Sequence, residues 1–301
     1  MSDINKNNLI YSLMPTYMHA YISLIRLDRP IGFLLLFYPA SFALSATSIP
    51  FNTFIYYLLL FLLGSIIMRS AGCIANDFFD IKFDKQIART QNRALASSKI
   101  SFLSAFIMFL FLMCMGLILL IQFNFQSILI GVLITPLVLL YPLAKRFFIF
   151  PQLILGLIYN WGVFIAWTAT GSIYPFKSFF ILYLATVVWT FVYDTIYATQ
   201  DENDDRNLKL YSSTMIIKSK RSIILAILSI FQFLLLLLFG FLMQFNFIFF
   251  IIVTSISLIY LYDILYIWSN NSNKSDDFFK RNNYYGFLIL LSIIIGSQFN
   301  V

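Results

Sequence analysis

Residues 53–84 read TFIYYLLLFLLGSIIMRSAGCIANDFFDIKFD, a long apolar run that ends in an asparagine and three aspartates. A second acidic run, DENDD at residues 201–205, follows another apolar stretch. Acidic side chains at membrane depth are costly, and they tend to mark functional sites. Carboxylates this dense beside hydrocarbon also require a cation. The two runs therefore indicate both the surroundings of this protein and the place of its site.

The composition is that of a polytopic membrane protein. Of the 301 residues, 60% are hydrophobic and only 11% are charged. Apolar runs near the spanning length of about 20 residues recur along the chain, and they lack the alternation of barrel strands. Because lipid offers no partner to open backbone groups, the spans should be helices. We predict an all-α protein with about nine transmembrane helices, at residues 30–48, 53–76, 102–122, 125–143, 153–171, 177–199, 222–243, 245–268 and 284–300.

The basic residues sort to one side of these spans. Nineteen of the 20 lysines and arginines fall on one face, and only Lys177 falls on the other. The positive-inside rule places the N-terminus and both acidic runs in the cytoplasm. This sorting explains the net charge of +7, so we expect no nucleic-acid partner. The absence of a recognisable signal or transit peptide favours a bacterial inner membrane over a mitochondrial one.

The predicted spans also define the domain organisation. Residues 1–29 should form a cytoplasmic or interfacial N-terminal segment, and residues 30–301 a single transmembrane domain. The spans leave no room for a soluble domain, so the bilayer is the first expected partner.

Helical spacing gathers the polar residues into two stripes. If the second span continues as a helix, Asn76, Asp80 and Asp84 follow one another at intervals of four residues, with Arg69 two turns earlier. A second stripe has spacings close to whole helical turns. Its members are Asp194, Tyr197, Asp201 and Asp205. Two such stripes facing each other would surround a shared space with carboxylates.

The ligand chemistry of these stripes suits magnesium. Oxygen-rich sites without imidazole favour hard cations such as Mg²⁺, which carboxylates hold together with substrate phosphate oxygens. A diphosphate that bridges two metal ions fits this description. Nearby basic side chains can donate to its remaining oxygens. These are Arg89, Lys145, Arg146, Arg206 and Lys209. No calcium loop and no P-loop occurs in the sequence.

The remaining polar residues have structural interpretations. Cys73 and Cys114 lie in apolar runs without the spacing of a metal knuckle, so we interpret them as packing residues. His19 is the only histidine, which excludes a multi-histidine metal site. Asp263 is an intramembrane acid without a motif, and we interpret it either as a residue that pairs helices or as one that lies near the membrane interface. The basic residues that we attribute to membrane orientation alone are Lys99, Lys218, Lys220, Arg221, Lys274, Lys280 and Arg281.

Several motifs in order resemble the UbiA-type intramembrane aromatic prenyltransferases. They are RLDRPIG at residues 26–32, the run at 69–84 and RTQNRALAS at 89–97. Three further motifs look like the branch that prenylates 4-hydroxybenzoate in ubiquinone synthesis. They are YPLAKR at 141–146, PQ at 151–152 with Gly156, and YDTIYA at 193–198 running on to Asp205. The likeness covers about residues 20–225.

The resemblance implies nine spans around a central cavity, with a side opening to lipid for a long isoprenoid chain. It implies that Mg²⁺ binds to Asp80, Asp84, Asp201 and Asp205, beside Asn76. It further implies roles for other side chains. Arg89, Tyr141 and Lys145 would contact the diphosphate, Arg69 the carboxylate of the acceptor, and Arg146 would belong to the active-site loop. Tyr197 is a further substrate-binding candidate. Ile81 stands where close relatives often have a basic residue.

The implied reaction transfers a polyprenyl group from polyprenyl diphosphate to the carbon ortho to the hydroxyl of 4-hydroxybenzoate. Mg²⁺ and basic side chains stabilise the departing diphosphate, and aromatic faces stabilise the allylic cation in a dry cavity. Asp77 and Asp194 are candidates to take the ring proton. With Arg146, they are the predicted catalytic residues.

Two other functions stay open. A prenyltransferase for a haem, menaquinone, chlorophyll or homogentisate-type acceptor is the nearer rival, disfavoured by the position of Arg69 and the pattern from Asp194 to Asp205. A transporter of cations or phosphate metabolites would also bury acidic residues. Transporters place their sites near the bilayer midplane, however, and here the carboxylates cluster at one edge.

Overall fold

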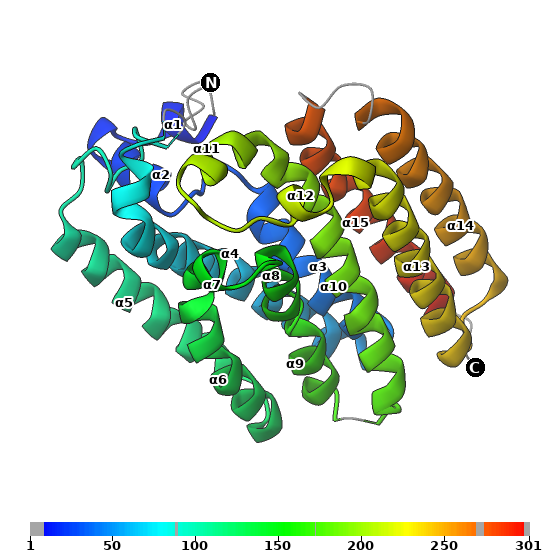
Figure 1. Ribbon diagram of the computed structural model, residues 1–301. Coiled ribbons are helices and arrows are strands. Elements are labelled where there is room, and N and C mark those ends of the chain that lie inside the picture. Colours follow the sequence, from blue (N-terminus) through cyan, green and yellow to red (C-terminus); the bar gives the residue numbers. More distant parts are fainter. Residues whose placement is uncertain (1–8, 88–89, 172, 269–273, 298–301) are drawn as a thin grey trace.

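Helices joined by turns and loops make up the part of the chain that the computed structural model describes, residues 9–87, 90–171, 173–268 and 274–297 (Figure 1). No strand occurs among these residues, so the all-α prediction is confirmed. The longer helices are α3 (Ile31–Ser45), α4 (Phe51–Asp84), α5 (Phe102–Leu120), α6 (Phe125–Leu140), α8 (Pro151–Tyr159), α9 (Gly162–Ala169), α10 (Phe176–Ala198), α13 (Arg221–Leu242), α14 (Phe247–Tyr262) and α15 (Ser275–Ser297). The shorter ones are α1 (Leu9–Leu13), α2 (His19–Leu24), α7 (Ala144–Phe147), α11 (Glu202–Asn207) and α12 (Ser213–Ile216).

The number of membrane spans differs from the prediction. Seven helical segments are long and apolar enough to cross a bilayer within the described ranges. Helix α3 is apolar but has only 15 residues, and the first half of α15 carries two aspartates, a lysine and an arginine. The predicted count of nine is therefore not confirmed. The predicted span 153–171 is also divided, because α8 ends at Tyr159 and α9 begins at Gly162.

Polar side chains cap the N-termini of three of the apolar helices. The Ser101 hydroxyl accepts a hydrogen bond from the Ser104 amide at the start of α5, and the Asn124 side chain does the same for Ser127 at the start of α6. The Asn246 side chain caps α14 in the same way. Such caps satisfy amide groups that a helix start leaves open, which matters most where no water can replace them.

Helix α10 lies at the centre of the packing and α5 at its edge. The apolar window of α10 is 72% buried inside the protein, whereas that of α5 is 11% buried. Helix α10 packs against α8, α13 and α15, and α3 packs against α4, α9 and α15. Trp189 of α10 is buried between Tyr38, Phe42 and Tyr193. The two helices that carry the acidic stripes therefore belong to one connected bundle.

The second acidic stripe is not one continuous helix. Helix α10 ends at Ala198, a 3-10 turn follows at Thr199–Asp201, and α11 begins at Glu202. A helix C-terminus disfavours negative charge and a helix N-terminus favours it. Because the helix is interrupted here, the acidic run does not lie at the end of α10. Glu202, Asp204 and Asp205 lie instead in the first turn of α11.

Candidate active site

The first acidic stripe lies on one uninterrupted helix. Helix α4 runs from the apolar region through to Asp84, so the expected continuation of the second span is confirmed. The Asn76 amide donates to Asp80 Oδ2 at 3.2 Å, the contact that an interval of four residues allows. Asp77, Asp80 and Asp84 are all buried. Buried carboxylates need compensation, and basic side chains supply it here.

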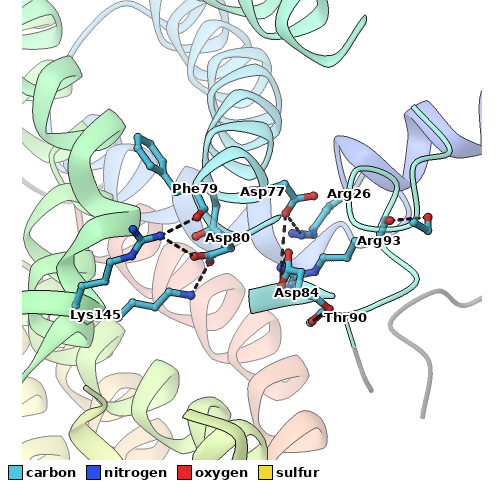
Figure 2. A network of polar contacts seen from close by, with 11 residues as sticks. Arg26, Asp77, Phe79, Asp80, Asp84, Thr90, Arg93 and Lys145 are labelled. Carbon is cyan, nitrogen blue, oxygen red and sulfur yellow. Dashed lines mark hydrogen bonds and ion pairs between the residues drawn. The ribbon is translucent and has the colours of Figure 1, made fainter. Parts of the chain in front are cut away.

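Asp80 is paired with the basic residues of α7 (Figure 2). Lys145 Nζ lies 2.5 Å from Asp80 Oδ2, and Arg146 Nη2 lies 3.8 Å from Asp80 Oδ1. Arg146 also donates to the Phe79 carbonyl at 2.7 Å and lies over the Phe83 ring. Two predicted site residues from a distant motif are thus brought onto the acidic stripe. Asp80 Oδ1 is buried and accepts no hydrogen bond from any residue that the structure describes.

Asp77 and Asp84 are paired with different arginines on another side of α4 (Figure 2). Arg26 Nη2 lies 2.7 Å from Asp77 Oδ1, and Arg93 Nη1 donates to both oxygens of Asp84 at 2.9 Å. Arg93 also lies 3.6 Å from Asp77. Arg26 has a φ of +53°, a conformation that is costly for a residue with a side chain. Arg26 lies in the turn between α2 and α3, and its ion pair with Asp77 links this turn to α4.

A cavity of about 820 Å³ opens beside these pairs. Its polar lining includes Arg69, Asn76, Tyr141, Asp194 and Tyr197, which are all predicted site residues. Three unpredicted arginines also line it, namely Arg26, Arg29 and Arg93. The cavity therefore has a strongly basic end, which suits an anionic substrate.

The rest of the cavity wall is apolar. Helices α4, α5 and α6 contribute most of it, with side chains such as Leu60, Leu117 and Ile134, and Phe123 adds to it from the turn between α5 and α6. Leu60 and Asn76 are both lining residues of α4, and at ~1.5 Å per residue they lie about 24 Å apart along the helix. One long space thus joins a basic end to a hydrocarbon-like wall.

Arg69 lines this cavity without a direct ion pair to any residue that the structure describes. Among the described residues, none forms a hydrogen bond or ion pair with its guanidinium, which lies over the Tyr159 ring with Cζ 5.9 Å from the centroid. Asp194 and Cys73 also line this region. An arginine inside a protein without an anionic partner is a site for an anionic ligand, because the charge has lost much of its hydration.

The segment that follows the second acidic run is held next to α7 and α8 by backbone and side-chain contacts. The Tyr211 amide donates to the Lys145 carbonyl at 2.8 Å, and Gln152 of α8 accepts from the amide and hydroxyl of Ser213. Gln152 belongs to the PQ motif, so its sequence signal has a structural basis. The contacts keep the connection after α11 close to the lysine that binds Asp80.

The two acidic runs do not form one compact metal cluster. No three histidine, cysteine or carboxylate side chains gather closely enough to hold a metal within the described ranges. Asp201 and Asp205 lie on either side of the start of α11. Arg89, a predicted diphosphate contact, lies outside the described residues. The proposed set of four metal-binding aspartates therefore stays a prediction.

Other charged residues form structural pairs away from the cavity. Glu202 lies 2.5 Å from Arg221 and 3.2 Å from Arg206. Asp263 accepts from Arg281 and, at 2.5 Å, from the Tyr285 hydroxyl, which joins the end of α14 to α15. Of the two interpretations of Asp263, these contacts support helix pairing.

Sequence reasoning missed several residues of the cavity. Phe279 of α15 lines it, and its ring lies 4.5 Å from that of Tyr197. It lies beyond the motif-bearing part of the chain, and one phenylalanine among 35 carries no signal of its own. Arg26 and Arg93 do lie inside recognised motifs, and that position was the signal by which they could have been selected.

Comparison with known proteins identifies the family of this chain. The model of the UbiA prenyltransferase family matches residues 32–290. The 4-hydroxybenzoate octaprenyltransferase of Haemophilus ducreyi is 32% identical over 280 residues, which cover 91% of this chain and 99% of that protein. The enzyme of the same name from Francisella tularensis subsp. novicida is 35% identical over 276 residues, covering 92% and 96%. That from Legionella pneumophila is 40% identical over 213 residues, covering 71% and 75%.

Solved structures share the fold. The apo structure of a UbiA homolog from Aeropyrum pernix has a TM-score of 0.71 at 20% identity, covering 88% of this chain and 97% of that one. A UbiA homolog from Archaeoglobus fulgidus bound to GPP and Mg²⁺ has a TM-score of 0.65 at 15% identity, covering 90% and 99%. With a family match over most of its length and these relatives, the chain belongs to the UbiA prenyltransferase family.

Proposed function

We propose that this protein transfers a polyprenyl group from a polyprenyl diphosphate to 4-hydroxybenzoate, a membrane step of ubiquinone biosynthesis. The new bond forms at the ring carbon ortho to the hydroxyl. The relatives that carry the name of this activity match nearly the whole chain, which supports the assignment. The reaction needs an anion site for each substrate and a dry apolar space for the chain.

The observation that carries this proposal is the Arg69 guanidinium. It faces the cavity without an ion-pair partner in the described part of the chain. A planar guanidinium binds a carboxylate through two parallel hydrogen bonds. The carboxylate of an aromatic acid would satisfy it. A haem-type or quinone-type acceptor without a carboxylate there would leave it unpaired, so this observation favours 4-hydroxybenzoate.

The acidic residues fit a divalent cation. Asp80 Oδ1 is buried and lacks a hydrogen-bond donor, and the ligands are all oxygen, as Mg²⁺ prefers. Asp80 and Asp84 would hold the ion from α4, and Asp201 and Asp205 from the segment after α10. Bound Mg²⁺ would neutralise charge that develops on the departing diphosphate.

Basic side chains would stabilise the negative charge of the diphosphate that the metal leaves uncompensated. Lys145 and Arg93 lie beside the carboxylates of α4 and can donate to diphosphate oxygens. Tyr141, at the cavity wall, is a further donor. As the allylic carbon–oxygen bond breaks, its electron pair leaves with the diphosphate, and these donors stabilise that negative charge.

Ring attack then forms the new carbon–carbon bond, and the ring loses the proton at the attacked carbon. We assign this proton to Asp194, because Asp194 lines the cavity. Asp77 is held by Arg26 and is not part of the cavity lining, so we propose a structural role for it rather than the catalytic one expected from the sequence. Arg146 is a positioning residue of Asp80 in this scheme.

The apolar part of the cavity would hold the isoprenoid chain. Its wall excludes water near the allylic cation, and the Tyr197 and Phe279 rings lie at the same end as Asp194. We propose the inner membrane of a bacterium as the location, with the N-terminus and the acidic runs in the cytoplasm. The distribution of basic residues and the bacterial relatives support this orientation and location.

An assay on membrane fractions tests the proposal. 4-Hydroxybenzoate and a polyprenyl diphosphate are supplied with Mg²⁺ or with EDTA, and prenylated acid is followed by chromatography. We expect product only with the metal, and none from Arg69→Leu, which should still bind the diphosphate. Prenylation of a different aromatic compound would refute the acceptor. Failure of every acceptor together with no diphosphate binding would favour a transporter.

A further inference from the structure

We infer that Gly32 and Tyr159 are positioning residues that set the Arg69 guanidinium for an aromatic carboxylate, and so determine acceptor specificity. The inference rests on the proposed function and names two residues for which we proposed no role above. Gly32, Arg69 and Tyr159 come from α3, α4 and α8, and all three line the cavity.

The Arg69 side chain lies directly on the backbone of Gly32. A Cβ atom added at Gly32 would lie 2.8 Å from Arg69 Nε, 3.5 Å from Nη2 and 3.6 Å from Cζ. The first distance is shorter than van der Waals contact permits. Any larger residue at position 32 must therefore displace the guanidinium. Gly32 has an ordinary backbone role in the first turn of α3, so the constraint comes from the close approach of Arg69.

Tyr159 holds the other side of the same group. Its hydroxyl donates to the Gly32 carbonyl, and its ring lies under the guanidinium. One side chain thus joins the start of α3 to the end of α8 and supplies the stacking surface for Arg69. Three helices meet at this point, and none of the contacts neutralises the charge.

The contacts of Arg69 with Gly32 and Tyr159, which we call the clamp, position a side chain that forms no hydrogen bond or ion pair with any other residue that the structure describes. An arginine loses rotamer entropy when it is ordered, and hydrogen bonds usually offset that loss. In the described residues Arg69 has no hydrogen bond, so packing alone fixes its plane before the acceptor binds. A fixed plane allows both hydrogen bonds to a carboxylate to form at once, at a set distance from Asp194.

The chemical class selected is a planar aromatic acid. The carboxylate bound by Arg69 fixes one end of the ring, and the attacked carbon must then lie near the allylic carbon. A displaced guanidinium weakens binding of the acid but not of the diphosphate, whose donors come from α7 and from the segment that contains Arg93. The clamp therefore predicts an effect on one substrate only.

The test compares wild type, Gly32→Ala and Tyr159→Phe in lipid vesicles. For Gly32→Ala we expect KM for 4-hydroxybenzoate to rise about tenfold or more, as for a lost charge-assisted hydrogen bond, and KM for geranyl diphosphate to stay within about twofold. Preference for 4-hydroxybenzoate over 4-hydroxybenzamide should fall by a similar factor. Tyr159→Phe keeps the ring but loses the hydroxyl, so it should shift the same quantities less.

Gly240→Ala is the matched control. Its added Cβ would lie 2.2 Å from Phe249 Cε1, between α13 and α14, so it introduces an even closer clash outside the cavity. It should lower thermal stability without changing the acid-to-amide preference. Equal rises in both KM values for Gly32→Ala, or an unchanged preference in both clamp variants, would overturn the inference. Absence of product from wild type with 4-hydroxybenzoate would instead refute the proposed function, which separates the two failures.

Discussion

Replacing Lys145 by methionine should strengthen binding of a divalent metal on its own and weaken binding of the diphosphate. Lys145 Nζ lies 2.5 Å from Asp80 Oδ2, and the exposed fractions of the two side chains are 29% and 2%. The lysine therefore binds the same carboxylate that the proposed metal requires as a ligand. A metal ion that binds alone must displace it, whereas a metal bound with diphosphate gives the lysine a new anionic partner.

The magnitude follows from the energy of that pair. A hydrogen bond between charged groups is worth about 1.5–3 kcal/mol. Lys145→Met removes this competition, so the affinity for Mn²⁺ alone should rise by about 10- to 100-fold, provided that Asp80 is a ligand. The affinity for diphosphate should fall by about tenfold, because one charged donor is lost. The apo protein should also lose stability, since Asp80 stays buried without its nearest cation.

Mn²⁺ binding followed by electron paramagnetic resonance, and diphosphate binding followed by calorimetry, measure the two affinities. Lys82→Met is the matched control, because Lys82 is exposed on the same helix and forms no ion pair with any carboxylate that the structure describes. It removes the same charge without releasing Asp80. If Lys145→Met weakens Mn²⁺ binding, or shifts it no more than Lys82→Met does, the reasoning is refuted.

Three further variants test separate parts of the molecule. Asp194→Asn should lower kcat at least about 100-fold with little change in either KM, as for loss of a general base, and an unaltered kcat would exclude Asp194 as the proton acceptor. In Gly64→Phe the new ring should fill part of the cavity, since an added Cβ at Gly64 meets nothing within 4 Å. KM should then rise for long-chain diphosphates and not for geranyl diphosphate. An equal rise in KM for both diphosphates would contradict the proposed site of the isoprenoid chain. Asp263→Asn should cost about 1–3 kcal/mol of stability, read as a lower melting temperature, because Arg281 and Tyr285 lose a charged acceptor, and an unchanged acceptor KM is expected.

Local periodicity explains what could be predicted about the site. The alignment of Asn76 with Asp80 depends only on the pitch of one helix, and the bond between them confirms it. The break after Ala198 was missed because a stripe drawn at helical spacing assumes that the helix continues. The acidic run at 201–205 opposes that continuation through the helix dipole, a signal that was present in the sequence.

The sequence by itself determined the membrane class, the helical fold, the family resemblance and the position of the acidic stripe on α4. These depend on composition and on spacing within one segment, which are local properties. Only the tertiary structure decided which cation pairs with which carboxylate. Arg26 with Asp77, Lys145 with Asp80, and Arg69 on Gly32 each join different elements. Such contacts arise from how whole helices pack, and no spacing along the chain encodes that geometry.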